Sequence, residues 1–169
     1  MKNNKMANKP QRFRILLIED NIDRINIFRQ WIYKDTLLAT ASSAGVAMGM
    51  LRRDNNIRNG RVYSGILLDH DLQEQAITVS DLSLSSTNLI DLIIENIENN
   101  VPILMHSMNA VQSITMKKRL EAAGFEVTQI PMKKLEKPVF DEWLKYCYEL
   151  WEEIEEPPAS WKKSPQKSN

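Results

Sequence analysis

Apolar residues along this chain fall into two patterns. Short continuous runs end at acidic, histidine or serine residues, and longer segments repeat an apolar residue every three or four positions. The runs predict buried strands and the longer segments predict amphipathic helices. The predicted strands cover residues 13–20, 36–41, 62–71, 101–107 and 125–130, and the predicted helices cover 21–35, 42–53, 86–97 and 109–124. A last helix begins near Pro138 and ends before Pro157.

The alternation of strands and helices predicts an α/β fold. We expect a doubly wound, five-stranded parallel sheet flanked by five helices, because such alternation is typical of parallel crossover units. The strands are continuously apolar, which indicates that helices cover both faces of the sheet. Ligands of such sheets bind at the carboxyl ends of the strands, so functional residues are expected there.

The predicted elements form one domain over residues 12–156. We expect residues 1–11 to be a flexible basic segment and residues 157–169 a flexible tail, with weak attraction to RNA or phosphate as the alternative for these basic ends. Residues 72–86 form a polar, Ser-rich link that exceeds the about 2–6 residues usual between a strand and a helix. This link is either a lid over a substrate or a disordered excursion.

Net charge, cysteine content and hydrophobic stretches limit the partners and the kinds of site that this protein can have. The formal net charge is zero, so it implies neither a nucleic-acid nor a membrane partner. Cys147 is the single cysteine, which excludes an internal disulfide and a cysteine-based zinc site, and its helical apolar position predicts a core residue. No stretch approaches the ~18 apolar residues that span a bilayer, and the N-terminus lacks a hydrophobic signal segment. We therefore expect a cytoplasmic protein.

Residues capable of chemistry gather at the ends of the first, third and fourth predicted strands. These ends are neighbours in a doubly wound sheet, so their side chains are expected to converge on one pocket. Both histidines of the chain belong to this group. The residues are Glu19, Asp20, Asp69, His70, Asp71, His106 and Ser107.

The acidic members of this group favour a metal ion. Glu19, Asp20 and Asp69 would repel one another without a cation, and their oxygen donors suit Mg²⁺ or Mn²⁺. The histidines His70 and His106 titrate near neutral pH and can divide acid and base roles in catalysis. The alternatives are a loop histidine bonded to the backbone for His70 and a buried, satisfied histidine for His106.

Two residues are candidates for holding phosphate. Arg24 follows Asp20 by one helical turn, and a guanidinium can grip phosphate through two hydrogen bonds. Asn109 begins the fourth predicted helix, whose backbone N–H groups form a modest anion site. The alternatives are a surface arginine paired with Asp20 or Asp23 and a plain helix N-cap at Asn109.

The strand ends resemble those of receiver domains of bacterial response regulators. The resemblance is carried by "ILLIEDN", "GILLDHDL", "PILMHSMNA" and "GFEVTQIPM" and covers roughly residues 12–155. It implies a flavodoxin-like receiver fold, with Asp69 at the phospho-acceptor position and Ser107 at the Ser/Thr switch position. It also implies that Glu19, Asp20 and Asp69 hold the metal and that the backbone carbonyl of Asp71 completes the metal shell.

Two features depart from that pattern. Receivers place a lysine before the proline that follows strand five, whereas Ile130 precedes Pro131 here and Lys133 and Lys134 come later. A standard receiver also needs neither of the two histidines. The chain is more similar to a divergent receiver branch proposed to process cyclic phosphates, whose strand ends read like "LDHDL" and "HSMN".

This closer similarity implies a stand-alone, metal-assisted phosphoesterase. Its substrate would be a phosphorylated or cyclic-phosphate small molecule or an RNA end. The implied catalytic residues are Asp69, His70, His106 and Ser107, with Arg24 and Asn109 on the phosphate. A signalling receiver phosphorylated on Asp69 and a catalytically silent interaction module stay open. The aromatic residues of the last helix are expected mainly in the core, with pairing of two copies through that region as the alternative.

Overall fold

The sheet has five parallel strands in the order β2-β1-β3-β4-β5. The computed structural model describes residues 12–57, 62–69, 71–72, 86–108 and 110–153. The strands are β1 (Arg14–Ile18), β2 (Leu37–Ala41), β3 (Gly65–Leu68), β4 (Ile103–Met105) and β5 (Val127–Gln129). This architecture confirms the predicted fold class. Residues His70 and Asn109, the link over 73–85 and both predicted tails lie outside the described residues.

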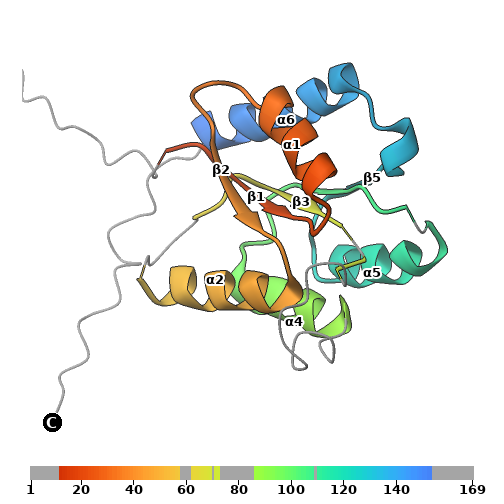
Figure 1. Cartoon of the computed structure of the whole chain (residues 1–169). Coiled ribbons are helices and arrows are strands. Elements are labelled where there is room, and N and C mark those ends of the chain that lie inside the picture. The colour runs from red at the N-terminus through yellow and green to blue at the C-terminus, as the bar shows by residue number, and fades with distance from the viewer. Residues whose placement is uncertain (1–11, 58–61, 70, 73–85, 109, 154–169) are drawn as a thin grey trace, which may run out of the picture.

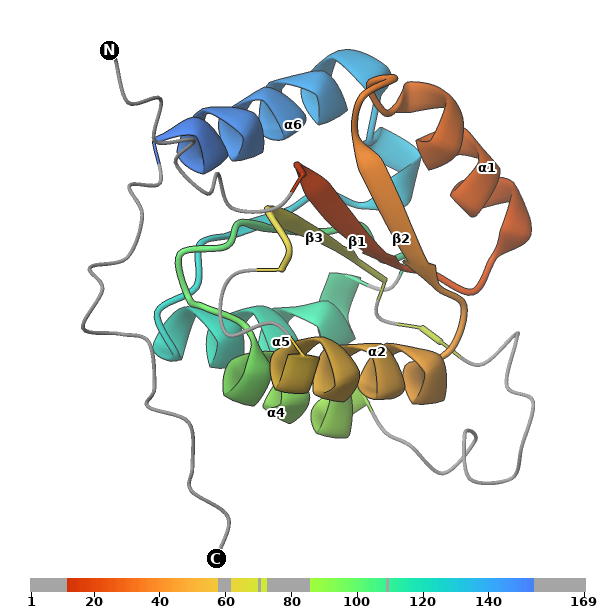
Figure 2. The same cartoon turned by 90° about the vertical axis from the view of Figure 1, so that its left-hand side faces the viewer.

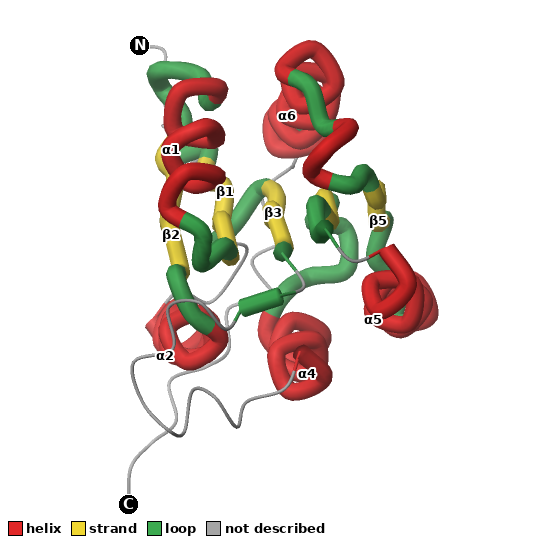
Figure 3. Tube along the Cα trace, turned by 45° about the vertical axis from the view of Figure 1, so that its right-hand side comes forward, coloured by secondary structure: helices red, strands yellow, loops and turns green. Residues whose placement is uncertain are grey.

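Helices cover both faces of the sheet, as the apolar strands predicted. The sheet therefore lies between two layers of helices (Figures 1, 2 and 3). The first face carries α1 (Ile22–Trp31) and α6 (Lys137–Glu152), and the second carries α2 (Ala44–Ile57), α4 (Ser86–Asn96) and α5 (Ala110–Ala122). A short 3-10 turn, η1 (Met132–Lys134), connects β5 to α6. None of the described helices is long and apolar enough to cross a membrane.

Successive strand residues supply two separate cores. Ile15 and Leu17 of β1 belong to the cluster under α1 and α6, whereas Leu16 and Ile18 belong to the cluster against the other three helices. This alternation follows from the period of two along a strand. All four side chains are fully buried, so neither face of β1 is free to contact water.

Two helix ends follow sequence signals. Ser43 precedes α2, and its hydroxyl oxygen accepts a hydrogen bond from the Val46 N–H at 3.1 Å, as expected for an N-cap. Gly124 follows α5 with a φ of 94°, a conformation that residues with side chains rarely adopt. The predicted end of this helix at Gly124 is therefore confirmed.

The register of the sheet determines which residues meet at its carboxyl edge. Ile18 pairs with Leu68, and Leu68 pairs with Met105. Glu19 follows Ile18, Asp69 follows Leu68 and His106 follows Met105. The Asp69 N–H donates to the Ile18 carbonyl at 2.9 Å and the His106 N–H donates to the Leu68 carbonyl at 3.1 Å, so the hydrogen bonds between strands continue up to these residues.

Helix α6 packs closely on the start of β3. An added Cβ at Gly65 would lie 2.8 Å from the Cys147 sulfur and 3.0 Å from Ile15 and Trp143 side-chain carbons. Cys147 is fully buried, which confirms the prediction that it is a core residue. This close approach requires glycine because any side chain would push the helix away from the strand.

We expect Gly65→Ala to lower the free energy of unfolding by about 1–3 kcal/mol, as overpacking of a filled core usually does. Gly49→Ala is the matched control. A Cβ at Gly49 meets nothing within 4 Å, and this exposed helical position should gain about 0.5–1 kcal/mol from alanine. Urea unfolding followed by circular dichroism measures both changes. Equal effects at the two positions would contradict the close packing of α6 on β3.

Candidate functional site

Three buried carboxylates meet at the carboxyl edge of the sheet. Glu19 and Asp20 follow β1, and Asp69 follows β3. One potential ligand atom from each lies within 4.8 Å of the others, and all three side chains are at most 1% exposed. We refer to Glu19, Asp20 and Asp69 as the acidic cluster. The structure thus brings together three of the four residues that the sequence predicted around a metal ion, Asp71 being the fourth.

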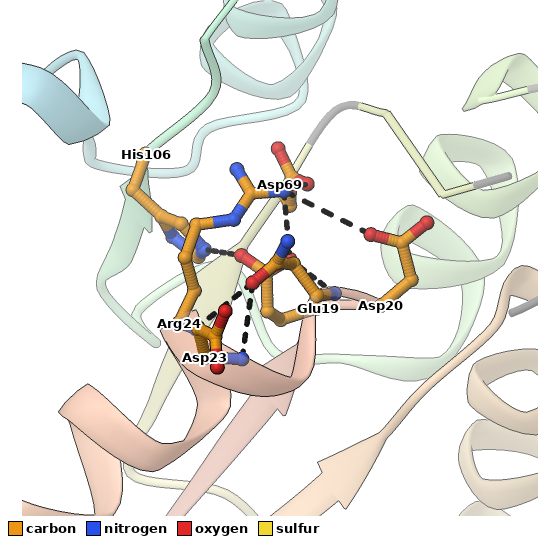
Figure 4. A network of polar contacts seen from close by, with 7 residues as sticks. Glu19, Asp20, Asp23, Arg24, Asp69 and His106 are labelled. Atoms are coloured by element: carbon orange, nitrogen blue, oxygen red, sulfur yellow. Dashed lines mark hydrogen bonds and ion pairs between the residues drawn. The ribbon is translucent and has the colours of Figure 1, made fainter. Parts of the chain in front are cut away.

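Both oxygens of the Glu19 carboxylate are engaged. Its Oε1 accepts a hydrogen bond from the Asn21 N–H at 2.9 Å and lies 3.1 Å from Nη2 of Arg24. Its Oε2 lies 3.0 Å from Nε2 of His106. These contacts come from Asn21 before α1, Arg24 within α1 and His106 after β4, and Figure 4 labels the last two beside Glu19.

Arg24 contacts the whole acidic cluster through one nitrogen. Its Nη2 lies 3.1 Å from Glu19, 3.3 Å from Asp69 and 3.9 Å from Asp20. The side chain comes from the first turn of α1 and is 16% exposed, so it is the most accessible member of this network (Figure 4). The side-chain oxygen of Asn21 caps this turn by accepting from the Asp23 and Arg24 N–H groups at 3.1 Å each.

His106 is fully buried between the acidic cluster and the core. Its ring lies edge-on to Phe28 of α1, with 4.8 Å between the centroids. Burial lowers the pKa of His106 to about 4, although the Asp69 charge opposes this shift. The ring is therefore neutral at physiological pH, and its Nε2 shares one hydrogen with Oε2 of Glu19 across 3.0 Å.

Two carboxyl groups of the cluster, those of Glu19 and Asp69, have raised pKa values. Burial raises the pKa of Glu19 to about 7, although the Asn21 N–H and the Arg24 charge favour the ionised form. Burial, and then the charge of Glu19, raise the pKa of Asp69 to about 7 against the opposing effects of His106 and Arg24. Desolvated carboxylates this close together require a cation to remain ionised.

The donor set of the cluster fits Mg²⁺ or Mn²⁺. Each member supplies carboxylate oxygen, which these hard cations prefer. Asp71 is exposed and outside the cluster, but its N–H donates a hydrogen bond to the Asp69 carboxylate. A metal contact through the Asp71 carbonyl therefore stays a prediction.

The end of β5 differs from the receiver pattern in space as well as in sequence. Ile130 packs against the core cluster under α1 and α6, and Lys133 and Lys134 are exposed in η1. Within the described part of the chain, the cation paired with Asp69 is Arg24. Ser107 is buried after β4, at 4% exposure, and its role as a switch residue stays a prediction.

Two contacts of the site were not anticipated from the sequence. Asn21 links the helix cap to Glu19, and a signal for it was present because an asparagine before an amphipathic helix is a typical N-cap. The pairing of His106 with Glu19 had no such signal, since 87 positions separate them along the chain.

The raised pKa of Asp69 predicts a pH-dependent effect of Asp69→Asn in metal-free buffer. The folded-state pKa of about 7 exceeds the ordinary aspartate value of 3.8, so the contribution of Asp69 to stability falls as the pH rises through this interval. At about pH 8 the neutral variant should be more stable than wild type by about 1 kcal/mol or more, since one pKa unit corresponds to about 1.4 kcal/mol. The difference should shrink towards about pH 5. Thermal unfolding in EDTA measures it, and a constant difference would contradict the pKa shift.

Comparison with known proteins shows the fold. No protein-family model matches the sequence, and no curated protein is similar to it. Solved structures do match, among them an adenylate cyclase from Rhodopirellula baltica at 16% identity and a TM-score of 0.59, with 83% of this chain and 90% of that chain covered.

Two further matches have metal in their structures. The receiver domain of a sensor histidine kinase from Pseudomonas aeruginosa, with magnesium coordinated in its active-site cleft, is 20% identical at a TM-score of 0.55, and the match covers 79% of this chain and 95% of that one. The Mn²⁺-bound form of response regulator Rcp1 is 15% identical at a TM-score of 0.57, with coverage of 86% and 99%. The chain therefore has the flavodoxin-like fold of receiver domains and an acidic cluster at the edge where such sheets bind their ligands.

Proposed function

We propose that this receiver-like domain binds Mg²⁺ or Mn²⁺ at the acidic cluster and processes a phosphate ester, with a cyclic phosphate on a small molecule or an RNA end as the substrate. The observation that carries the proposal is the guanidinium of Arg24 beside Asp69 and Glu19. The guanidinium can bind phosphate oxygens, and the carboxylates beside it can bind a metal ion. One site therefore offers both kinds of contact.

The metal part of the proposal is supported by chemistry and by likeness. Glu19, Asp20 and Asp69 would hold the ion through carboxylate oxygens. Two solved structures with this fold contain magnesium or manganese. When bound, the ion supplies positive charge that stabilises negative charge developing on the phosphoryl oxygens.

The remaining roles belong to side chains around the cluster. Arg24 binds phosphate oxygens from the more exposed side of the site. The Glu19 carboxylate, which would hold the ion, is oriented by the contact of its Oε2 with Nε2 of His106. The sequence assigns His70 and Ser107 to catalysis and Asn109 to phosphate binding, and these assignments enter the proposal unchanged.

His106 supports this chemistry by either of two routes. In one, His106 itself moves a proton, as the sequence suggested. In the other, the buried ring holds Glu19 in position through the contact of 3.0 Å between Nε2 and Oε2. We favour the second route because the ring is 0% exposed and packs on Phe28.

A turnover screen tests the proposal. The purified protein with Mg²⁺ or Mn²⁺ should hydrolyse a member of a panel of cyclic and linear phosphodiesters. Asp69→Asn should reduce this turnover by about 100-fold or more, as expected on loss of a metal ligand and charged group. Asp23→Asn is the matched control because Asp23 is an exposed acid on the neighbouring helix turn. Wild-type inactivity over the whole panel would reject the enzymatic proposal.

Two His106 variants in the same assay separate the two routes. Glutamine can still donate an N–H to Glu19, whereas alanine cannot. If His106 holds Glu19, His106→Gln should retain much more turnover than His106→Ala. If His106 transfers the proton itself, both variants should lose about 100-fold or more.

A second candidate function is a signalling receiver phosphorylated on Asp69. The fold and the buried position of Asp69 after β3 favour it equally well. The absence of a lysine at Ile130 argues against it, because an acyl-phosphate would then lack its usual partner.

Beryllofluoride with Mg²⁺ tests this second function. We expect weak binding or none, since Ile130 packs against the core where receivers have a lysine and Lys133 and Lys134 are exposed in η1. Isothermal titration measures the binding, and acetyl phosphate followed by intact-mass analysis measures the covalent adduct. A stoichiometric adduct that Asp69→Asn abolishes would favour signalling over ester processing.

A further inference from the structure

The position of Arg24 has a consequence for metal binding itself. Its Nη2 lies within 3.9 Å of one oxygen from each of the three carboxylates that would hold the ion. A divalent ion bound by the same groups needs oxygens at about 2.0–2.1 Å and carries charge of the same sign. The guanidinium and the ion therefore compete for the acidic cluster.

We propose that Arg24 is an internal counter-cation that occupies the acidic cluster when metal is absent and is displaced towards phosphate when metal binds. This inference rests on the proposed metal site and describes how Arg24 would regulate metal binding there. In the metal-free state the guanidinium offsets the repulsion among buried carboxylates. In the metal-bound state the same group becomes available to a phosphate oxygen, so phosphate capture follows metal binding.

The surroundings of Arg24 allow this movement. The carboxylates are buried, whereas the Arg24 side chain is 16% exposed and extends from the first turn of α1. Its neighbours Ile22 and Asp23 are exposed. The side chain can move outward without opening the apolar core, because Ile25 and Phe28 fix the inner face of the helix.

The competition separates Arg24 from an ordinary phosphate-binding arginine. An arginine that served only the substrate would leave metal affinity unchanged when it is removed. A competing arginine weakens metal binding, so its removal should strengthen that binding. The sign of the change in Mn²⁺ affinity therefore identifies the role.

The test is Mn²⁺ titration followed by electron paramagnetic resonance of the free ion. Arg24→Met should bind Mn²⁺ at least about tenfold more tightly than wild type, because a positive charge next to the ion is removed. Arg24→Lys, which keeps the charge, should remain close to wild type. Arg29→Met is the matched control, since Arg29 is exposed in the last turn of the same helix and loses the same charge.

Inorganic phosphate gives a second readout. Wild type should bind phosphate more tightly with Mn²⁺ than in EDTA, and Arg24→Met should lose most of this gain. Thermal unfolding in EDTA should also show Arg24→Met to be less stable than Arg29→Met, because the carboxylates then lack their counter-cation.

The outcomes separate two failures. If Arg24→Met binds Mn²⁺ as wild type does or more weakly, while Asp69→Asn abolishes the binding, the competition is rejected and the metal site stands. If Mn²⁺ binds neither wild type nor Arg24→Met at a site that depends on Asp69, the proposed metal function is rejected and the inference falls with it.

Discussion

The burial of carboxylates at the carboxyl edge of the sheet is the constraint on which the site depends. The parallel register places Glu19 and Asp69 next to each other, and helices on both faces exclude water from them. Charge at this position must be neutralised by a proton, a guanidinium or a metal ion. The guanidinium of Arg24, protons retained by the raised pKa values of Glu19 and Asp69, and the proposed metal ion would each reduce the negative charge of the acidic cluster.

His106 shows how the same constraint extends into the core. Its ring has a polar contact with Glu19 on one side and an aromatic contact with Phe28 on the other. Helix α1 carries Arg24 and Phe28 four residues apart, so both lie on the side of the helix that faces the sheet. Helix α1 therefore contributes both the aromatic ring that packs on His106 and the guanidinium that offsets the charge of the acidic cluster.

The sequence predicted the sheet, the flanking helices and the convergence of Glu19, Asp20 and Asp69. These features follow from the spacing of apolar residues and from the positions where apolar runs end, which are local signals. It named Arg24 but did not show whether this residue paired at the surface or within the cluster. The contact of His106 with Glu19 could not be predicted, since it depends on register between β1 and β4 through β3. A residue pattern identifies which groups share an edge, whereas side-chain partners require the three-dimensional packing.

The junction between β1 and α1 is short, and Asn21 both caps the helix and binds Glu19. An α-helix turns by about 100° for each residue. One inserted residue between Asp20 and Arg24 would therefore rotate the guanidinium away from the carboxylates and separate the cap from Glu19. Divergence within this lineage should consequently preserve the length of the segment over 19–24, and changes in chain length should accumulate in connections remote from the acidic cluster.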